Sequence, residues 1–374
     1  MRYTVMSADK EVAVVENDRL EILDQKLVPL YLKRTHNFKK WVEDRAIDAT
    51  RPNSRVLKKA HGLSRMASDF DTAMLYNAAS ITDNFWVRKG SETWEDVKFD
   101  NDLYFKAAVS TDPTVFNRDP SRTPEFTNIG SREKGWRFID GDWWLYKNEP
   151  AENTMFELLT YKIGSSLGFD MACYEMDEGF IRTRDVTKGE VNMQAIDALV
   201  YDHNGVTDEN MSYNYDTLYD IKPELAKQYM DIKYLDVLVN NVDRHTKNYA
   251  VLTSQETGEI ISLAPNYDND MAFYGYPKIL NMDRIHGEMK EFLDLAIRVD
   301  YDPPRLDVKT ITEILQEFDL RDEMKDYLIA GEKVVVTSVK QGQIVKQLKT
   351  VQDLALTKGL VTNGEAKLSE DVWE

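Results

Sequence analysis

Three side chains that carry oxygen stand at spacings that suit a magnesium site: Asp243, Asn248 and Asp268. Mg²⁺ takes a few hard oxygen ligands from a protein, and phosphate oxygens and water complete its octahedron. Phosphoryl transfer needs such ligands together with a carboxylate that orients the attacking hydroxyl and accepts its proton. We therefore predict a phosphotransferase centre in which Asp243 is the base or orienting residue and Asn248 and Asp268 hold the metal.

The elements around these residues are expected to bring them together. Residues 229–240 have the apolar periodicity of an amphipathic helix, which ends just before Asp243. Residues 249–253 and 260–264 predict two strands separated by a polar turn. Antiparallel pairing places the start of the first strand beside the end of the second. The loop that carries Asp243 would then lie next to the loop that carries Asp268.

A smaller set of elements precedes this centre. Residues 136–139 and 143–147 predict a hairpin around Gly141. A helix follows, with Asn153 as its expected N-cap, and residues 180–183 predict another strand. After residue 187 the chain is expected to be mainly helical, with late helices over residues 308–318 and 322–330 and a mobile polar loop over residues 202–219.

The front third predicts a further small sheet and at least two helices. Residues 11–15, 20–23 and 28–32 have the composition of short strands, and helices are expected over residues 38–46 and from Ser54 onward. Residues 113–124 are polar with three prolines and predict a linker. The predicted domains are an accessory region (1–115), an N-lobe (116–186) and a C-lobe (187–374).

The run from Asp243 to Asn248, followed by a hairpin and by Ala-Pro-Asn-Tyr-Asp at residues 264–268, resembles the signature of the HipA-like serine/threonine kinases. The resemblance covers about residues 127–330. It implies an α+β, bilobal, protein-kinase-like fold with a β-rich N-lobe and a helical C-lobe, and it implies ATP and Mg²⁺ as cofactors. It also implies transfer to a protein Ser or Thr. Family members often act as toxins held by a small helix-turn-helix antitoxin.

The resemblance assigns a nucleotide loop. Residues 130–134 are Gly-Ser-Arg-Glu-Lys and are similar to the Gly-rich loop of the family. Gly130, Ser131 and Lys134 are therefore expected to contact ATP, although two glycines alone would fit a plain turn. Some family members are regulated by phosphorylation in this loop, so we predict autophosphorylation at Thr127 or Ser131.

The resemblance also assigns an ion pair. Lys147 matches the lysine that contacts the ATP phosphates, and Glu157 on the next helix matches the glutamate that pairs with it. Taken alone, either residue would fit an ordinary exposed position. Residues 1–115 differ from the usual front domain of the family, a departure that concerns partner binding and toxin behaviour and leaves the implied chemistry unchanged.

Composition limits the classes of function. The net charge is −18, which argues against direct nucleic-acid binding, and the basic stretch over residues 51–65 is expected to be a solvated helix face. Cys173 is the single cysteine, which excludes an intrachain disulfide and a Cys-based metal cage. No run approaches the ~20 apolar residues of a membrane span, so a cytoplasmic protein is expected.

Two other functions compete with a protein kinase. A kinase of a lipid or a small molecule would keep the same residues, because fold does not fix the substrate. A regulator that binds nucleotide without transfer could use residues 1–115 to contact a partner or DNA. The presence of Asp243, Asn248, Asp268 and Lys147 together favours transfer, since a binding module has no need of a base.

Overall fold

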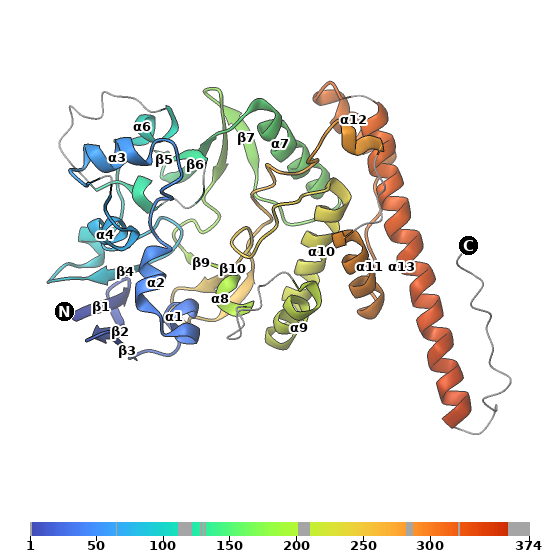
Figure 1. Cartoon of the computed structure of the whole chain (residues 1–374), viewed down its shortest axis with the longest axis horizontal. Helices are drawn as coiled ribbons and strands as arrows, with labels where there is room; N and C mark the ends of the chain where they lie inside the picture. Colours follow the sequence, from blue (N-terminus) through green and yellow to red (C-terminus); the bar gives the residue numbers. More distant parts are fainter. Residues whose placement is uncertain are drawn as a thin grey trace.

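The computed structural model describes residues 2–64, 66–110, 122–127, 130, 132–200, 210–281, 287–320 and 322–357. Three small antiparallel sheets follow one another along the chain, and helices surround them (Figure 1). This mixed architecture agrees with the predicted α+β class. Residues 113–121 of the expected linker, and with them the boundary between residues 115 and 116, fall outside the described residues. Its last residues are part of the fold, since Arg122 donates to the backbone oxygen of Tyr76 at 3.0 Å.

The first sheet has the strand order β3-β2-β1-β4 and lies at the N-terminal end of the molecule (Figure 1). Leu30–Thr35 forms a helix, so the strand predicted over residues 28–32 is wrong. Pro29 lies at the N-cap of this helix, where its missing N–H is tolerated. The elements of this region are β1 (Arg2–Ser7), β2 (Lys10–Glu16), β3 (Arg19–Ile22), α1 (Leu30–Thr35), α2 (Phe38–Glu43), α3 (Ser54–Ala60), α4 (Asp69–Leu75), β4 (Phe85–Arg88), α5 (Trp94–Val97), α6 (Phe105–Ser110) and the 3-10 helix η2 (Pro124–Thr127).

The second sheet has the order β5-β6-β8-β7 and contains the predicted hairpin, which is confirmed. The helix that follows begins at Ala151, so Asn153 is not its N-cap. The side chain of Asn153 instead donates to the backbone oxygen of Asp270 at 2.8 Å. The elements are β5 (Glu133–Ile139), β6 (Asp142–Asn148), α7 (Ala151–Ser166), β7 (Tyr174–Asp177) and β8 (Phe180–Arg184).

The third sheet has the order β11-β10-β9, and the second predicted hairpin is confirmed by the pairing of Val251 with Leu263. Met211–Ile221 forms a helix capped by the Asn210 side chain, so the predicted loop over residues 202–219 is wrong for its described second half. The elements are β9 (Val191–Ala195), α8 (Asp197–Val200), α9 (Met211–Ile221), α10 (Pro223–Val239), β10 (Ala250–Ser254), β11 (Ile260–Leu263) and η3 (Lys278–Asn281).

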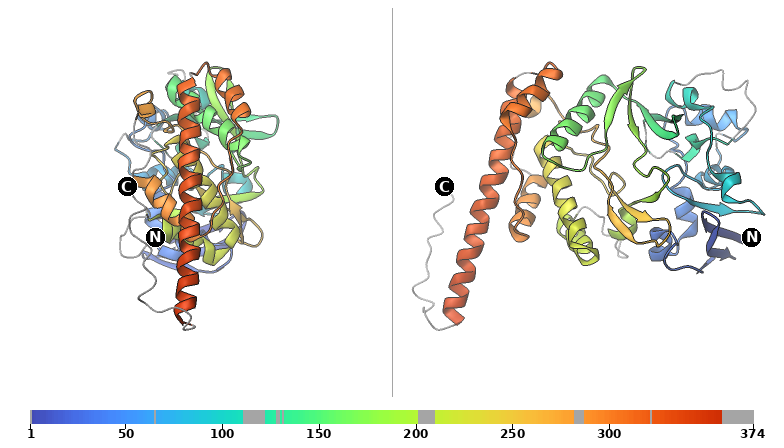
Figure 2. Two further views of the ribbon diagram at one scale, coloured as in Figure 1. Left: turned by 90° about the vertical axis from the view of Figure 1, so that its right-hand side faces the viewer. Right: turned by 180° about the vertical axis from the view of Figure 1, so that it is seen from behind.

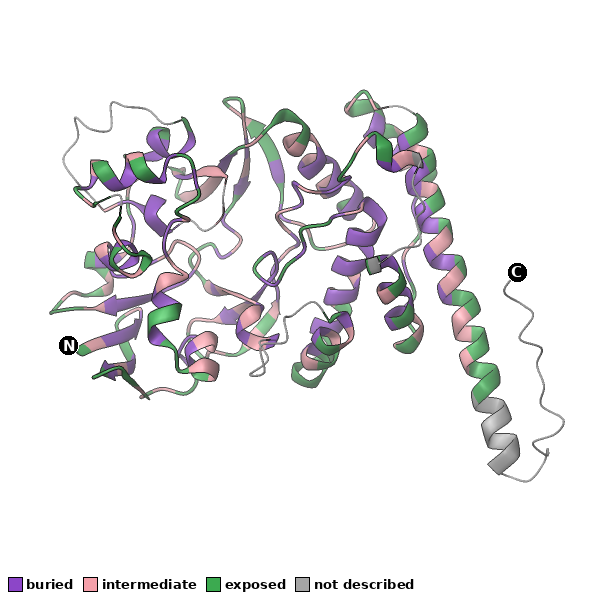
Figure 3. Cartoon of the chain, viewed as in Figure 1, coloured by how far each residue is buried: buried purple, intermediate pink, exposed green. Residues whose placement is uncertain are grey.

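Helix α10 (Pro223–Val239) is the centre of the largest apolar core, to which its buried residues Tyr229, Leu235 and Leu238 belong. The last helices are α11 (Gly287–Arg298), α12 (Val308–Glu317) and α13 (Asp322–Thr357). The two late helices are confirmed, but α13 is far longer than predicted and runs along one edge of the molecule (Figure 2). Its first part contributes to the core, whereas exposed residues dominate further along it (Figure 3). Among the described residues, no helix combines the length and apolarity that a membrane crossing requires.

Candidate active site

Lys147 is the hub of a buried charge cluster between the second sheet and the loop after β11. Its Nζ lies 2.6 Å from Glu157 Oε2 and 2.7 Å from Asp268 Oδ1. The backbone N–H of Asn269 donates to the other oxygen of Glu157 at 2.9 Å. Strand β6, helix α7 and the segment after β11 therefore meet at one ammonium group.

Opposing charges keep this cluster ionised. Burial alone would lower the pKa of Lys147, but the nearby Asp268 and Glu157 carboxylates outweigh it and raise that pKa well above its usual value. Burial would likewise raise the pKa of Asp268, but Lys147 and Lys134 hold it well below its ordinary value. The cluster therefore contains an ammonium and a carboxylate that both stay charged at neutral pH, as metal and phosphate binding require.

Strand pairing places a second lysine in the same site. Lys134 on β5 pairs with Lys147 on β6, and the two strands are antiparallel. Desolvation lowers the pKa of Lys134, which the charge of Asp268 partly offsets. A Cβ built on Gly130 would lie 2.6 Å from Lys134 Nζ, and the φ of Gly130 is +104°. The glycine thus gives the lysine room and adopts a conformation that side-chain-bearing residues rarely take.

The predicted nucleotide loop is only partly described. Ser131 lies outside the described residues, so the structure does not test its predicted contact with ATP. Thr127 is buried, and its hydroxyl donates to the backbone oxygen of Pro124 at 2.8 Å. Autophosphorylation at either residue stays a prediction.

Two further carboxylates interact with Lys147, and no pattern in the sequence indicates them. Glu149 Oε1 lies 3.5 Å from Lys147 Nζ, and Glu149 Oε2 is buried without a hydrogen-bond partner. Burial raises the pKa of Glu149 to about 7. Burial, helped by the charge of Asp268, raises the pKa of Asp270 to about 6. Glu149 and Asp270 stand two positions after Lys147 and Asp268, respectively. An acidic residue at that spacing is too common in a sequence to be singled out.

The loop after α10 presents the second half of the site. The helix ends at Asn240, which takes a left-handed conformation with φ of 51°. Asp243 is exposed, whereas Asn248 is buried. The Asn248 side-chain nitrogen donates to the backbone oxygen of Asp243 at 2.8 Å. This bond fixes the length of the loop and leaves the amide oxygen of Asn248 available as a ligand.

Arg244 fastens this loop to the segment that carries Asp268. Its guanidinium donates to the backbone oxygens of Asn248 at 2.6 Å and of Tyr267 at 2.7 Å. The same group bonds both oxygens of Asp236 on α10 at 3.1 Å. Burial alone would lower the pKa of Arg244, but the nearby Asp236 carboxylate outweighs it and raises that pKa above the usual value. One buried arginine therefore holds Asp243, Asn248 and Asp268 in register.

The sequence motif contains Arg244 without assigning it a role, and Asp236 lies outside the motif. The only sign of Asp236 in the sequence is that it is an acidic residue on the apolar helix that leads into the motif. His245 in the same loop is exposed, and its ring nitrogen accepts from the Lys247 N–H at 3.2 Å.

The residues present fit a magnesium ion that is shared with phosphates. Among the described residues, no three His, Cys, Asp or Glu side chains are arranged to hold a metal by themselves. The side-chain hydrogen bonds of Asp268 and Asn248 use one carboxylate oxygen and the amide nitrogen, respectively. Each side chain keeps an oxygen for a ligand, which is the donor type that Mg²⁺ prefers when substrate phosphates complete its shell.

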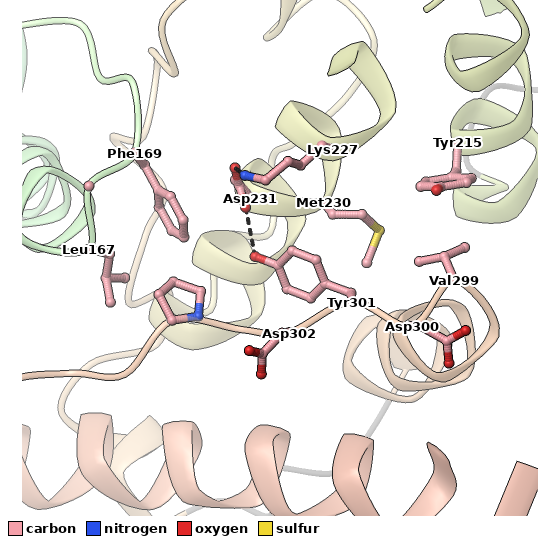
Figure 4. A pocket seen from close by; sticks show the side chains of 12 residues that line it. Leu167, Phe169, Tyr215, Lys227, Met230, Asp231, Val299, Asp300, Tyr301 and Asp302 are labelled. Atoms are coloured by element: carbon pink, nitrogen blue, oxygen red, sulfur yellow. Dashed lines mark hydrogen bonds and ion pairs between the residues drawn. The ribbon is translucent and has the colours of Figure 1, made fainter. Parts of the chain in front are cut away.

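A separate pocket of about 430 Å³ lies between α7, α10 and the segment after α11 (Figure 4). Tyr301 and Asp231 line it and share a hydrogen bond of 2.8 Å. None of the predicted site residues lines this pocket. The pocket therefore contributes nothing to the cluster around Lys147.

Neither a protein-family model nor a curated protein sequence matches the chain. A similar structure is that of the toxin–antitoxin system HipA, HipB and operator DNA complex of Shewanella oneidensis MR-1, with 10% identity and a TM-score of 0.52. The match covers 91% of this chain and 97% of that chain. The proinflammatory kinase CtkA of Helicobacter pylori shares 17% identity over 58% of this chain and 95% of that chain, with a TM-score of 0.42. On the first of these likenesses, which extends over nearly the whole chain, this protein has a HipA-like fold.

Proposed function

We propose that the chain is an ATP- and Mg²⁺-dependent phosphotransferase that acts on Ser or Thr hydroxyls of a protein. One observation carries the proposal: Lys147 contacts Glu157 and Asp268 at once, beside a loop that presents Asp243 and Asn248. A positive group for phosphates, oxygen ligands for Mg²⁺ and an exposed carboxylate are the parts that phosphoryl transfer needs. The HipA-like fold supports the same conclusion.

In this proposal each residue has a stated task. Glu157 orients the Lys147 ammonium toward the ATP phosphates, and Gly130 and Lys134 line the nucleotide loop. Asn248 and Asp268 would hold Mg²⁺, which supplies positive charge to the β- and γ-phosphates when bound. Asp243 orients the acceptor hydroxyl and takes its proton as the bond from oxygen to the γ-phosphorus forms. The bond between that phosphorus and the bridging oxygen breaks, and ADP leaves.

The proposal includes a partner. The structural neighbour from Shewanella oneidensis was solved in complex with HipB and operator DNA, which supports an antitoxin-like partner for this chain as well. A toxin role would follow if transfer to a cellular protein arrests growth and the partner prevents it.

The test compares wild type, Asp243→Ala and Asp216→Ala with Mg²⁺ and γ-labelled ATP, with and without cell extract. Asp216 is a matched control, because it is an exposed aspartate in a surface ion pair with Arg298. We expect label on protein with the wild type and Asp216→Ala but not with Asp243→Ala. Transfer that survives in Asp243→Ala would refute the assigned base. ATP binding without transfer in any variant would identify a nucleotide-binding regulator instead.

A further inference from the structure

The segment of residues 44–53, between α2 and α3, touches both sides of the candidate active site. It belongs to the accessory region, for which the sequence offers no function. Its first residue contacts the loop that carries Asp243, and Arg51 near its other end contacts Lys134 on strand β5, the strand that pairs with the one carrying Lys147. We call residues 44–53 the strut.

At one end, Asp44 Oδ1 lies 3.3 Å from Lys247 Nζ. Lys247 stands immediately before Asn248, and its backbone oxygen accepts from the hydroxyl of Tyr267 at 3.1 Å. Lys40 holds the same Asp44 oxygen at 2.8 Å from within α2. Asp44, at the C-terminal end of α2, is thereby fixed against the loop that carries Asp243 and Asn248.

At the other end, Arg51 is 1% exposed and donates from Nη2 to the backbone oxygen of Lys134. It also reaches the backbone oxygen of Ala108 on α6 at 3.4 Å. The Asn53 side-chain nitrogen donates to the backbone oxygens of Ala107, at 3.2 Å, and Ala108. Because Lys134 pairs with Lys147 across the sheet, the strut bonds the strand pair that presents both lysines.

The middle of the strut is anchored, so its two ends cannot move independently. Arg45 donates to both oxygens of Asp83 at 2.8 and 2.9 Å and to the backbone oxygen of Ala78 at 2.6 Å. The Ile47 N–H donates to the backbone oxygen of Phe126, just before the nucleotide loop, at 2.6 Å. These bonds tie a short segment to the first sheet and to η2.

We propose that the strut is a positioning element that sets the spacing between the lysine-bearing strands and the catalytic loop. Asp44 and Arg51 are its positioning residues. Phosphoryl transfer depends on donor and acceptor held in line, where a misplacement of about 1 Å is costly. The inference rests on the proposed function for its kinetic consequence, but the contacts exist whatever the substrate.

The kinetic test uses Asp44→Asn and Arg51→Lys with two matched controls. Glu43→Gln changes the neighbouring carboxylate, whose ion pair with Lys39 is confined to α2. Arg55→Lys changes an exposed arginine of α3. We expect Asp44→Asn to lower kcat about threefold with the KM for ATP unchanged, since one partly exposed ion pair is lost. We expect Arg51→Lys to raise the KM for ATP about tenfold, since lysine lacks the planar fork of donors with which Arg51 reaches the carbonyls of Lys134 and Ala108.

A double-mutant cycle tests the Asp44 contact itself. If Asp44 acts through Lys247, the double variant Asp44→Asn/Lys247→Met loses no more kcat than Lys247→Met alone. Losses that multiply would mean that Asp44 acts elsewhere. This cycle uses surface substitutions, so it remains informative if Arg51→Lys fails to fold.

Hydrogen exchange separates the strut from the proposed activity. Without ATP, backbone amides of residues 242–249 should exchange faster in Asp44→Asn than in wild type or Glu43→Gln. Equal exchange in all three, with kinetics matching the controls, would overturn the strut. Faster exchange in a protein whose wild type transfers no phosphate would keep the strut and refute the proposed function.

Discussion

Lys147 Nζ and Asp268 Oδ1 lie 2.7 Å apart although 121 residues separate them along the chain. The contact joins Lys147, near the end of β6, to Asp268, whose backbone is left-handed with a φ of 60°. The Asp268 N–H is held by the hydroxyl of Tyr174 at 3.2 Å. Asp tolerates the left-handed conformation better than most residues, and this backbone bond helps to hold Asp268 in it.

Asp268→Asn should abolish transfer while the protein still folds. The substitution keeps the shape of the side chain but removes the negative charge that Mg²⁺ and Lys147 both need. We expect phosphotransfer to fall at least about 100-fold, because metal-assisted charge stabilisation contributes several kcal/mol. Labelled transfer at varied Mg²⁺ measures this. Asp300→Asn, in a surface pair with Lys346, serves as the control and should stay near wild type.

Gly130→Ala should weaken ATP binding more than it weakens folding. The new methyl group would meet the flexible end of Lys134, and that lysine must move away from the site. Gly141→Ala is the matched control, because Gly141 has a similar φ of +90° and nothing within 4 Å of the added carbon. Both variants should lose about 1 kcal/mol of stability from backbone strain. Only Gly130→Ala should require a higher ATP concentration for the same rise in melting temperature. An identical dependence of melting temperature on ATP in the two variants would contradict the assignment of residues 130–134 to the nucleotide loop.

Arg244→Met should be strongly destabilising. It would leave Asp236, whose side chain is 2% exposed, as a buried charge without its partner. Breaking such a pair lowers the free energy of unfolding by about 3–5 kcal/mol. Urea denaturation measures the change. Arg298→Met removes an exposed pair with Asp216 and should change stability by less than about 1 kcal/mol. Similar losses in the two variants would argue against Arg244 as the fastening point.

Glu149→Gln should stabilise the protein at high pH. The pKa of Glu149 is raised from 4.5 to about 7 by burial, so the folded state binds this proton more tightly than the unfolded state does. The free energy of unfolding that protonated Glu149 contributes is therefore lost as pH rises from 4.5 to about 7. The melting temperature of Glu149→Gln should exceed that of wild type by a margin that grows over this range and then stays constant. Glu152→Gln, an exposed change on α7, should show no such trend.

The sequence by itself determined the local elements near the site and the residue types to which we assign its proposed chemistry. Apolar residues and turn residues specify the hairpins β5–β6 and β10–β11 and helix α10, because these signals lie within a few residues of one another. The amphipathic pattern predicted for α10 is wrong for its second half, where residues 232–239 are all buried. The spacing from Asp243 to Asn248 and the position of Asp268 after a hairpin are likewise local properties. The strand predicted over residues 28–32 and the loop predicted over the described residues 210–219 are wrong, because these segments form helices that pack against distant parts of the chain.

Only the tertiary structure decided which charges meet and how they are held. Lys147 could meet Asp268 only once two sheets and α7 had packed together. The roles of Arg244, Glu149 and the strut depend on burial, which turns an ordinary charged residue into a fixed one. Burial removes the competing water, so an ion pair or a backbone contact becomes specific in direction and distance. No spacing along the chain encodes that environment, because its members come from residues 44 to 270 and converge only in the folded protein.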